Sequence, residues 1–465
     1  MKKLLYLSFA LFLFACSEAP VVNKTVISGK IINPVNDFVF VRSMDQSDST
    51  MLDSTGIFRL EMDIDKPGYY IFSDGNEITH IYISPGDNIY MTLNTEAFDE
   101  TIEYSGHGSV PNQFLAGKYL VNEKMTRDPK ESYMLNEEEF RHFVDSNHTV
   151  LLHYLDTFFT GQSVQYDEFI DFEKSKMLYD KATLLLVYPS YYMYFSSNKD
   201  YQPGEDYYAF LDEVDINNSR FLELQEFKSF VGRYISHKAG EKVKQLPQLK
   251  KYDHPYYMAV FAVINDEVMD TDVKIYLLEE FMMRVVNYEG LDKSDTLLTM
   301  FYDNCTDTTL IKKVDEGIKA RERIAKGQPA PGFKYPDIND KMVALKDFKG
   351  KYVYIDVWST RCGPCIAEIP YIKELQQEFK DKNIVFVSVS LDNSRSAWEK
   401  MVKDRELKGV QLFAMHGWES TINKDYSIKG IPRFILIDKE GKIVDATAPR
   451  PSGKIRDVIL SLEGI

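Results

Sequence analysis

Hydrophobic positions divide the chain into three stretches with different periods. From residue 24 to residue 108, short apolar runs at 25–27, 38–41, 57–60 and 81–83 alternate with turn-forming residues. Short strands separated by turns at this spacing are typical of antiparallel β folds. The pattern predicts a small β-sandwich over residues 24–108.

In the second stretch, residues 109–325, apolar residues recur three and four positions apart. This period is that of amphipathic helices, whose apolar side chains must share one face. The stretch predicts a helical middle region without a repeat of fixed length. The helices are expected at 137–159, 166–188, 205–238, 258–269, 272–288 and 310–325.

The third stretch, residues 326–465, alternates strands with helices. An apolar run at 352–358 precedes a helix from Cys362 to about Phe379, and a second apolar run follows at 384–390. A further strand at 434–438, a final strand and a C-terminal helix complete the pattern. Such alternation predicts an α/β domain with a parallel or mixed sheet, so the chain is expected to be multidomain.

The first 15 residues have the pattern of a signal peptide. Lys2 and Lys3 precede an apolar run at 4–14, which is shorter than the roughly 20 residues that cross a bilayer. The run ends in Leu-Phe-Ala-Cys, which resembles a bacterial lipobox, so Cys16 is the expected lipidation site and residues 16–23 a tether. The alternative is an ordinary signal peptide with an incidental cysteine. The expected location is the envelope of a Gram-negative-type bacterium, lipid-anchored and facing the periplasm.

Composition narrows the function classes. The formal net charge of −16 argues against a nucleic-acid partner, which requires a basic surface. The 30 Tyr and 29 Phe favour aromatic packing over disorder. Four cysteines, one of them at the end of the signal segment, do not form a structural disulfide framework.

Two of these cysteines stand in a Cys-Gly-Pro-Cys motif. A strand runs into Cys362 and a helix is expected to begin there, so free N–H groups and the helix dipole would lower the pKa of its thiol. Cys362 is therefore the expected nucleophile, and Cys365, one turn on, the resolving thiol. A zinc site is the alternative, but it needs two more ligands. Cys305 and the eight scattered histidines offer no second pair, so we expect no metal and no cofactor beyond the redox-active disulfide.

Residues 327–465 resemble the thioredoxin-like family of TlpA, ResA and DsbE, with a domain of the AhpC/TSA-Redoxin type. The motifs that carry the resemblance are Ala330-Pro331, Lys349-Gly350-Lys351, WxxxCxxC, Ala367-Glu368-Ile369-Pro370 and Gly430-Ile431-Pro432. Residues 24–108 loosely resemble the N-terminal domain of unknown function that precedes thioredoxin domains in many Gram-negative lipoproteins.

The resemblance implies a substrate-binding surface around the cysteines. It places Pro432 in a cis-proline loop and Ile431 where the backbone pairs with an extended substrate strand. The expected substrate-binding residues are Ile431, Pro432, Gly363, Pro364, Trp358 and Arg361, with Trp358 a packing residue under the site. The cation of Arg361 would further favour thiolate.

Asp356 is the most informative carboxylate. It lies six residues before Cys362 in an otherwise apolar strand, where burial should raise its pKa. It could then accept the proton of Cys365, as its likeness to the buried aspartate of thioredoxins implies. The lysine that thioredoxins place nearby has no counterpart at 384–390, which leaves a route through water or Glu368 open. The alternative is a strand-end Asp bonded to backbone.

These features favour a membrane-anchored thiol-disulfide oxidoreductase that reduces disulfides in exported proteins, with cytochrome c maturation as one setting. A membrane thiol reductase would supply its electrons, and the oligomeric state is left open. One alternative is a disulfide oxidase or isomerase, and another is an envelope lipoprotein that binds a partner through residues 24–325 and uses its redox domain as an accessory. A peroxidase would need PxxxTxxC, but Ile355 occupies the proline position.

Overall fold

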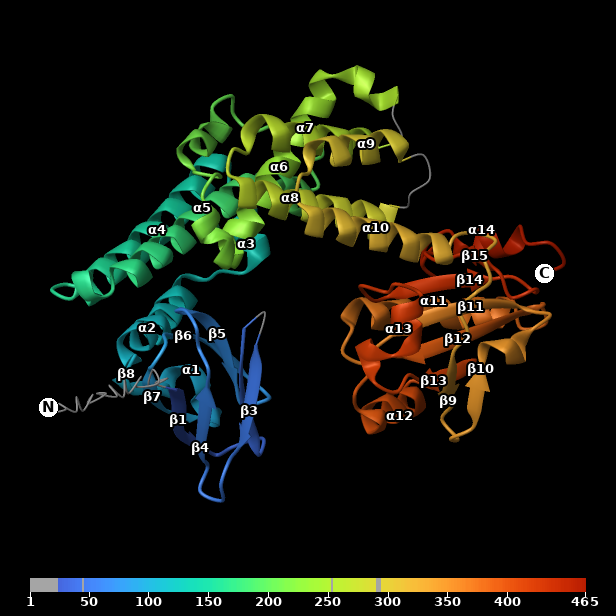
Figure 1. Cartoon of the computed structure of the whole chain (residues 1–465), viewed down its shortest axis with the longest axis horizontal. Helices are drawn as coiled ribbons and strands as arrows, with labels where there is room; N and C mark the ends of the chain where they lie inside the picture. Colours follow the sequence, from blue (N-terminus) through green and yellow to red (C-terminus); the bar gives the residue numbers. More distant parts are fainter. Residues whose placement is uncertain (1–23, 44–45, 252–253, 290–293) are drawn as a thin grey trace, which may run out of the picture. The chain divides into compact units, whose positions relative to one another are not determined.

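The computed structural model describes residues 24–43, 46–251, 254–289 and 294–465. The predicted signal peptide, tether and Cys16 lipidation site lie outside these residues. The chain forms two compact units, of which the first ends at Tyr234 and the second begins at Ile235 (Figure 1). Within the described ranges, no helix combines the length and hydrophobicity needed to cross a membrane.

The first unit opens with two four-stranded sheets, in the orders β4-β1-β7-β8 and β3-β2-β5-β6. Side chains from both sheets, among them Ile27, Phe58, Val39 and Phe72, form one buried cluster. The predicted strand-rich region is thus present. The strands are β1 (Thr25–Ile32), β2 (Phe38–Arg42), β3 (Ser47–Met51), β4 (Ile57–Met62), β5 (Gly68–Ser73), β6 (Ile78–Ile83), β7 (Asn88–Asn94) and β8 (Glu103–His107).

Strand β3 shows why the hydrophobic pattern did not predict every strand. Its residues are Ser-Asp-Ser-Thr-Met, and none of them is buried. Among the strands that the structure describes, it pairs with β2 alone, at the edge of its sheet. An edge strand with solvent on both faces needs no apolar alternation, so periodicity cannot reveal it.

The helical middle region is confirmed, with corrections at its boundaries. A single helix over 205–238 is wrong, because this stretch contains two short 3-10 segments, η3 (Tyr207–Glu213) and η4 (Ser219–Glu223), and α6 begins only at Gln225. The intervening Asp-Ile-Asn-Asn has low helix propensity. The helices are α1 (Phe98–Thr101), α2 (Ser109–Met125), α3 (Pro129–Tyr133), α4 (Glu137–Phe158), α5 (Asp167–Ser196), α6 (Gln225–Gln245), α7 (Pro255–Glu267), α8 (Thr271–Arg284), α9 (Asp295–Asn304) and α10 (Thr308–Arg323).

The C-terminal domain has a central five-stranded sheet in the order β13-β12-β11-β14-β15. Strands β11, β12 and β13 are parallel to one another, β14 is antiparallel to β11, and β15 is antiparallel to β14, so the sheet is mixed as expected. Its elements are β9 (Lys334–Pro336), β10 (Met342–Ala344), β11 (Tyr352–Trp358), α11 (Gly363–Glu378), β12 (Ile384–Ser390), α12 (Arg395–Asp404), β13 (Val410–Phe413), α13 (Thr421–Asp425), β14 (Arg433–Ile437), β15 (Ile443–Asp445) and α14 (Ile455–Leu460).

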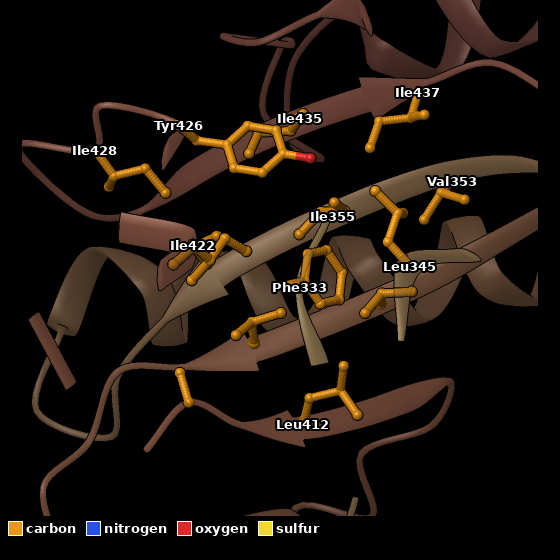
Figure 2. Packing of buried hydrophobic residues seen from close by; sticks show 14 of the residues in the cluster. Phe333, Leu345, Val353, Ile355, Leu412, Ile422, Tyr426, Ile428, Ile435 and Ile437 are labelled. Atoms are coloured by element: carbon orange, nitrogen blue, oxygen red, sulfur yellow. The ribbon is translucent and has the colours of Figure 1, made fainter. Parts of the chain in front are cut away.

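Strand β11 is central, and all seven of its residues are buried. Its side chains alternate between two cores because strand neighbours point to opposite faces. Val353 and Ile355 pack into the cluster of Figure 2, with Phe333, Leu412 and Ile437. Tyr352 and Tyr354 join the cluster on the opposite face, which contains side chains of α11 and α14. The same alternation puts Asp356 on the face covered by α11.

A buried ionic cluster joins sheet and helices in the first unit. Glu173 of α5 is fully buried, and its carboxylate accepts hydrogen bonds from Tyr69 at 2.7 Å and from Lys118 at 2.7 Å. Lys176 lies 3.4 Å from the same carboxylate and 3.9 Å from the centre of the Tyr69 ring. Burial alone would raise the pKa of Glu173, but the two lysines outweigh it and lower the pKa to about 2.

Replacing Glu173 by alanine should therefore destabilise the first unit by about 3 kcal/mol, because the largely enclosed ammonium groups of Lys118 and Lys176 lose its charge. Lys176 keeps one counter-charge, since Glu226 lies 3.6 Å from its Nζ. All three tryptophans, at 358, 398 and 418, lie in the C-terminal domain. The variant should thus lower the thermal transition seen by far-UV circular dichroism and leave that of tryptophan fluorescence unchanged.

The neighbouring variant Lys174→Ala is the matched control. It removes an exposed ion pair with Asp156, worth at most about 1 kcal/mol. Equal effects of the two variants would show that the Glu173 cluster does not hold the unit together.

Candidate functional site

The two motif cysteines lie where strand β11 gives way to helix α11. Cys362 is the N-cap residue of the helix, which begins at Gly363, and Cys362 and Cys365 form a disulfide. The Cys365 backbone N–H donates a hydrogen bond to the Cys362 sulfur at 3.2 Å. Cys362 is partly exposed and Cys365 is 3% exposed. An incoming thiol or disulfide can therefore reach Cys362, whereas Cys365 is shielded, in keeping with nucleophilic and resolving roles.

The segment between β11 and Cys362 is fixed by a carboxylate that the sequence reading did not identify. Asp392, buried just after β12, accepts hydrogen bonds from the Ser359 hydroxyl at 2.8 Å and from the Thr360 hydroxyl at 2.7 Å. The Thr360 backbone N–H lies 3.0 Å from each of its oxygens, and the Ser390 hydroxyl donates to it at 2.6 Å. The sequence contained a signal for Asp392. The apolar run of β12 leads into Ser-Leu-Asp, and parallel strands such as β11 and β12 end at the same edge of the sheet.

The proline loop lies beside the cysteines. Val357 of β11 pairs with Arg433 of β14, so the residues before β14 reach the end of β11 that leads to the motif. The Ile431–Pro432 peptide is cis, and both residues are partly exposed. Ile431 packs in the same cluster as Cys362 and Cys365. The structure thus brings together residues that are about 70 positions apart in the chain.

Not all of the predicted substrate-binding residues are exposed to solvent. Gly363, Pro364 and Arg361 are exposed beside the disulfide. Trp358 is 2% exposed and packs against Cys365 and Trp398, so it supports the site from below and is corrected to a packing residue alone. A tryptophan that ends a central strand has helices over both faces, which explains its burial.

Asp356 is buried on the α11 side of the sheet. Burial is the main reason that its pKa rises to about 7, while a hydrogen bond from Ser388 lowers the pKa and the nearby charge of Glu368 raises it. A carboxyl group that titrates near neutral pH can accept and release a proton under working conditions.

Glu368, one turn after Cys365, is also buried. Its two oxygens accept hydrogen bonds from the Ser452 backbone N–H at 2.9 Å and the Ser452 hydroxyl at 2.8 Å, and Arg450 lies 3.9 Å away. These partners come from the segment before α14, more than 80 residues further along the chain. Glu368 and Asp356 also interact electrostatically, so two buried acidic groups lie together where α11 covers the sheet.

The remaining cysteine of the described residues, Cys305, differs from this pair in burial and reactivity. Cys305 is 4% exposed, and burial raises the pKa of its thiol. A buried thiol with a raised pKa is a poor nucleophile. Within the described ranges, no group of three or more His, Cys, Asp or Glu side chains could hold a metal ion.

Comparison with known proteins assigns the C-terminal domain. The Redoxin family matches residues 325–458. Thiol-disulfide oxidoreductase ResA of Bacillus thuringiensis subsp. konkukian is 36% identical over 123 residues, which are 26% of this chain and 69% of ResA. ResA of Bacillus subtilis is 32% identical over 124 residues, 27% of this chain and 68% of that protein.

Solved structures of similar domains match the same part of the chain. The thioredoxin domain of a thiol-disulfide oxidoreductase from Bacteroides vulgatus is 34% identical and covers 29% of this chain and 96% of its own, with a TM-score of 0.28. Through its C-terminal domain, the chain belongs to the thioredoxin-like family of TlpA- and ResA-type proteins and is a thiol-disulfide oxidoreductase.

Proposed function

We propose that this chain is a lipid-anchored reductase of disulfides in exported proteins, attached through Cys16 in the cell envelope. The observation that carries the proposal is the arrangement of Cys362 at the start of α11 with Cys365 shielded behind it. The apolar run at 4–14 and Cys16 support export and anchoring. A membrane thiol reductase would return electrons to the pair, and apocytochrome c is one candidate substrate.

The reduction moves two electrons from the cysteine pair to the substrate. The Cys362 thiolate attacks a substrate disulfide, so that a mixed disulfide forms and one substrate thiolate leaves. The Cys365 thiol then gives its proton to Asp356, and the resulting thiolate attacks the Cys362 sulfur. This closes the Cys362–Cys365 disulfide and releases the second substrate thiolate, and both leaving thiolates take up protons from water.

The direction is argued from what stabilises the reduced pair. Strong oxidants of this fold owe their high potential to a stabilised reduced form. Here Glu368 is buried one turn after Cys365 and interacts with Asp356, and negative charge on these carboxyl groups would disfavour a thiolate in the pair. Arg361 would act in the opposite sense, but it is exposed and water screens its charge. The balance favours a reducing pair over a disulfide oxidase.

A disulfide isomerase is one alternative function. It would use the same cysteines, since CxxC pairs of this fold span a wide range of potentials.

A partner-binding lipoprotein is the other alternative. In such a protein, residues 24–325 would bind the partner and the redox domain would be accessory. The exposed aromatic residues Tyr191 and Tyr194 on α5 are the observation that favours this idea.

The reduction potential separates the two directions. In glutathione or dithiothreitol redox buffers, the pair in the full chain should equilibrate near the thioredoxin value of about −270 mV. A value near the roughly −120 mV of strong oxidants would contradict the reductase assignment.

A cysteine variant should capture the substrate. Cys365→Ala leaves the nucleophile without its resolving partner, so mixed disulfides with envelope proteins should accumulate and disappear on addition of dithiothreitol. Non-reducing electrophoresis and mass spectrometry would identify the captured proteins. Cys305→Ala is the control, because this buried thiol should leave the captured set unchanged. Adducts that persist in the Cys362→Ala,Cys365→Ala double variant would contradict the assigned roles.

Asp356 gives the domain a particular pH dependence. Its pKa is about 7 in the folded chain and close to 3.8 when unfolded, so the unfolded state loses its proton first and stability falls as pH rises from about 4 to 7. Asp356→Asn should remove this loss and raise the free energy of unfolding at pH 8 by up to about 4 kcal/mol, at about 1.4 kcal/mol per pKa unit.

Tryptophan fluorescence in denaturant would measure this difference within the domain that contains Asp356. At pH 3 both side chains are neutral, so the variant and the wild type should have similar stability. The variant should also close its disulfide more slowly, because the proton of Cys365 has lost its acceptor. Equal stability at pH 8 would mean that the Asp356 pKa is not raised.

A further inference from the structure

A small, partly open cavity has the buried residue Asp356 in its wall. Its volume is about 20 Å³, and a cavity needs about 10–15 Å³ to hold one water molecule. The wall is formed by β11, α11, β12 and the segment leading into β13. Its lining residues are Asp356, Trp358, Ile369, Ile372, Lys373, Gln376, Ser388, Leu407, Lys408 and Gln411.

Part of this wall is polar and unsatisfied. The Gln376 Oε1, the Gln411 Oε1 and the Trp358 Nε1 are buried, and none has a hydrogen-bond partner in the part of the chain that the structure describes. The amide groups of both glutamines are held in place, because each Nε2 donates to the Lys408 carbonyl, at 3.2 Å from Gln376 and 2.7 Å from Gln411. Their oxygens remain as acceptors.

These groups match the needs of a water molecule. Buried waters usually make two to four hydrogen bonds to polar groups that lack other partners. A water here can donate to the Gln376 and Gln411 oxygens and accept from the Trp358 N–H or from protonated Asp356. An apolar cavity would stay dry, whereas this one has both donors and acceptors in its wall.

The cavity is close to a surface pocket. A pocket of about 460 Å³ lies between α11 and β12, and Lys373, Gln376 and Lys408 line both this pocket and the cavity. Gln376 is only partly buried, while Asp356 is buried. Gln376 therefore stands at the border between the cavity and the surface pocket.

We propose that water in this cavity carries the proton that Asp356 receives from Cys365 out to the surface pocket, with Gln376 and Gln411 as positioning residues. The Cys365 thiol loses the proton, Asp356 accepts it and then releases it to the cavity water, and the solvent of the pocket takes it up. This inference rests on the role of Asp356 in the proposed function. It supplies a proton exit that uses no lysine of β12.

The titratable groups around this route are few. Tyr354 of β11 interacts electrostatically with Asp356, as does Glu368 of α11. Lys373 of α11 and Lys408, before β13, stand at the wall shared with the pocket. The Lys373 ammonium donates to the Arg405 carbonyl at 2.5 Å. Ser388 of β12 contributes only its hydroxyl.

Two variants test the route in the full-length protein. Gln411→Met and Gln376→Met keep the length of the side chain but remove its polar atoms. Mixed with oxidised glutathione, the reduced variants should close the Cys362–Cys365 disulfide about tenfold more slowly near pH 7, a modest share of what a positioned proton acceptor contributes. Gln377→Met is the matched control, since Gln377 lines the surface pocket but not the cavity, and its rate should equal that of the wild type.

A double-variant comparison separates proton transfer from structural damage. In the Asp356→Asn background, Gln411→Met should cause no further slowing, because both changes interrupt the same route. A tenfold loss that recurs in that background would overturn the proposal, as would equal slowing by Gln377→Met.

The water itself can be observed without any activity. Nuclear Overhauser contacts between a long-lived water and the Gln411 side-chain amide should appear in the wild-type protein and disappear in Gln411→Met. A dry cavity in the wild type would overturn the inference even if the disulfide exchange proceeds as proposed. Conversely, a hydrated cavity in a chain whose Cys365→Ala variant captures no substrate would contradict the proposed function and leave the water site standing.

Discussion

The carboxylate of Asp392 is the constraint on which the redox site depends. Parallel pairing of β11 and β12 brings Asp392 beside the residues that leave β11. Its oxygens then satisfy Ser359 and both the backbone and hydroxyl groups of Thr360. The chain is thereby turned within three residues, from Ser359 to Arg361, so that Cys362 caps α11. Without this turn, the helix N-terminus would have no fixed place relative to the sheet, and its N–H groups could not act on a thiolate.

A second consequence of this arrangement is the polarity of the space behind the cysteines. Because α11 covers one face of the sheet, any polar side chain of β11 on that face is enclosed. Asp356 is such a residue, and enclosure converts an ordinary carboxylic acid into one with a pKa of about 7. Burial would also lower the stability of the domain if the polar atoms around Asp356 had no hydrogen-bond partners. The proposed water beside Gln376 and Gln411 would satisfy these atoms and give the proton a path.

Hydrophobic periodicity predicted an element correctly where burial alone decides its structure. Strands β11 and β12 have the predicted bounds, because a strand buried on both faces is built from a nearly continuous apolar run. It failed at β3, an edge strand of polar residues, and at η3 and η4, where tertiary contacts hold short turns in a stretch that looked helical. Corresponding limits apply to the site: Trp358 has a residue type suited to binding, but packing against residues of α11 and α12 buries it.

The sequence by itself determined the chemistry, because a Cys-Gly-Pro-Cys motif between an apolar strand and a helix already specifies a thiol pair with one accessible and one shielded member. It also indicated Asp356, since a single acid in an apolar strand must be enclosed. Only the tertiary structure decided which groups meet these residues. Asp392, Ser452, Gln411 and Ile431 lie 27 or more positions from the motif and carry no local signal of their role. Hydrogen bonds and cavities depend on distances in space, which sequence spacing does not encode across separate elements.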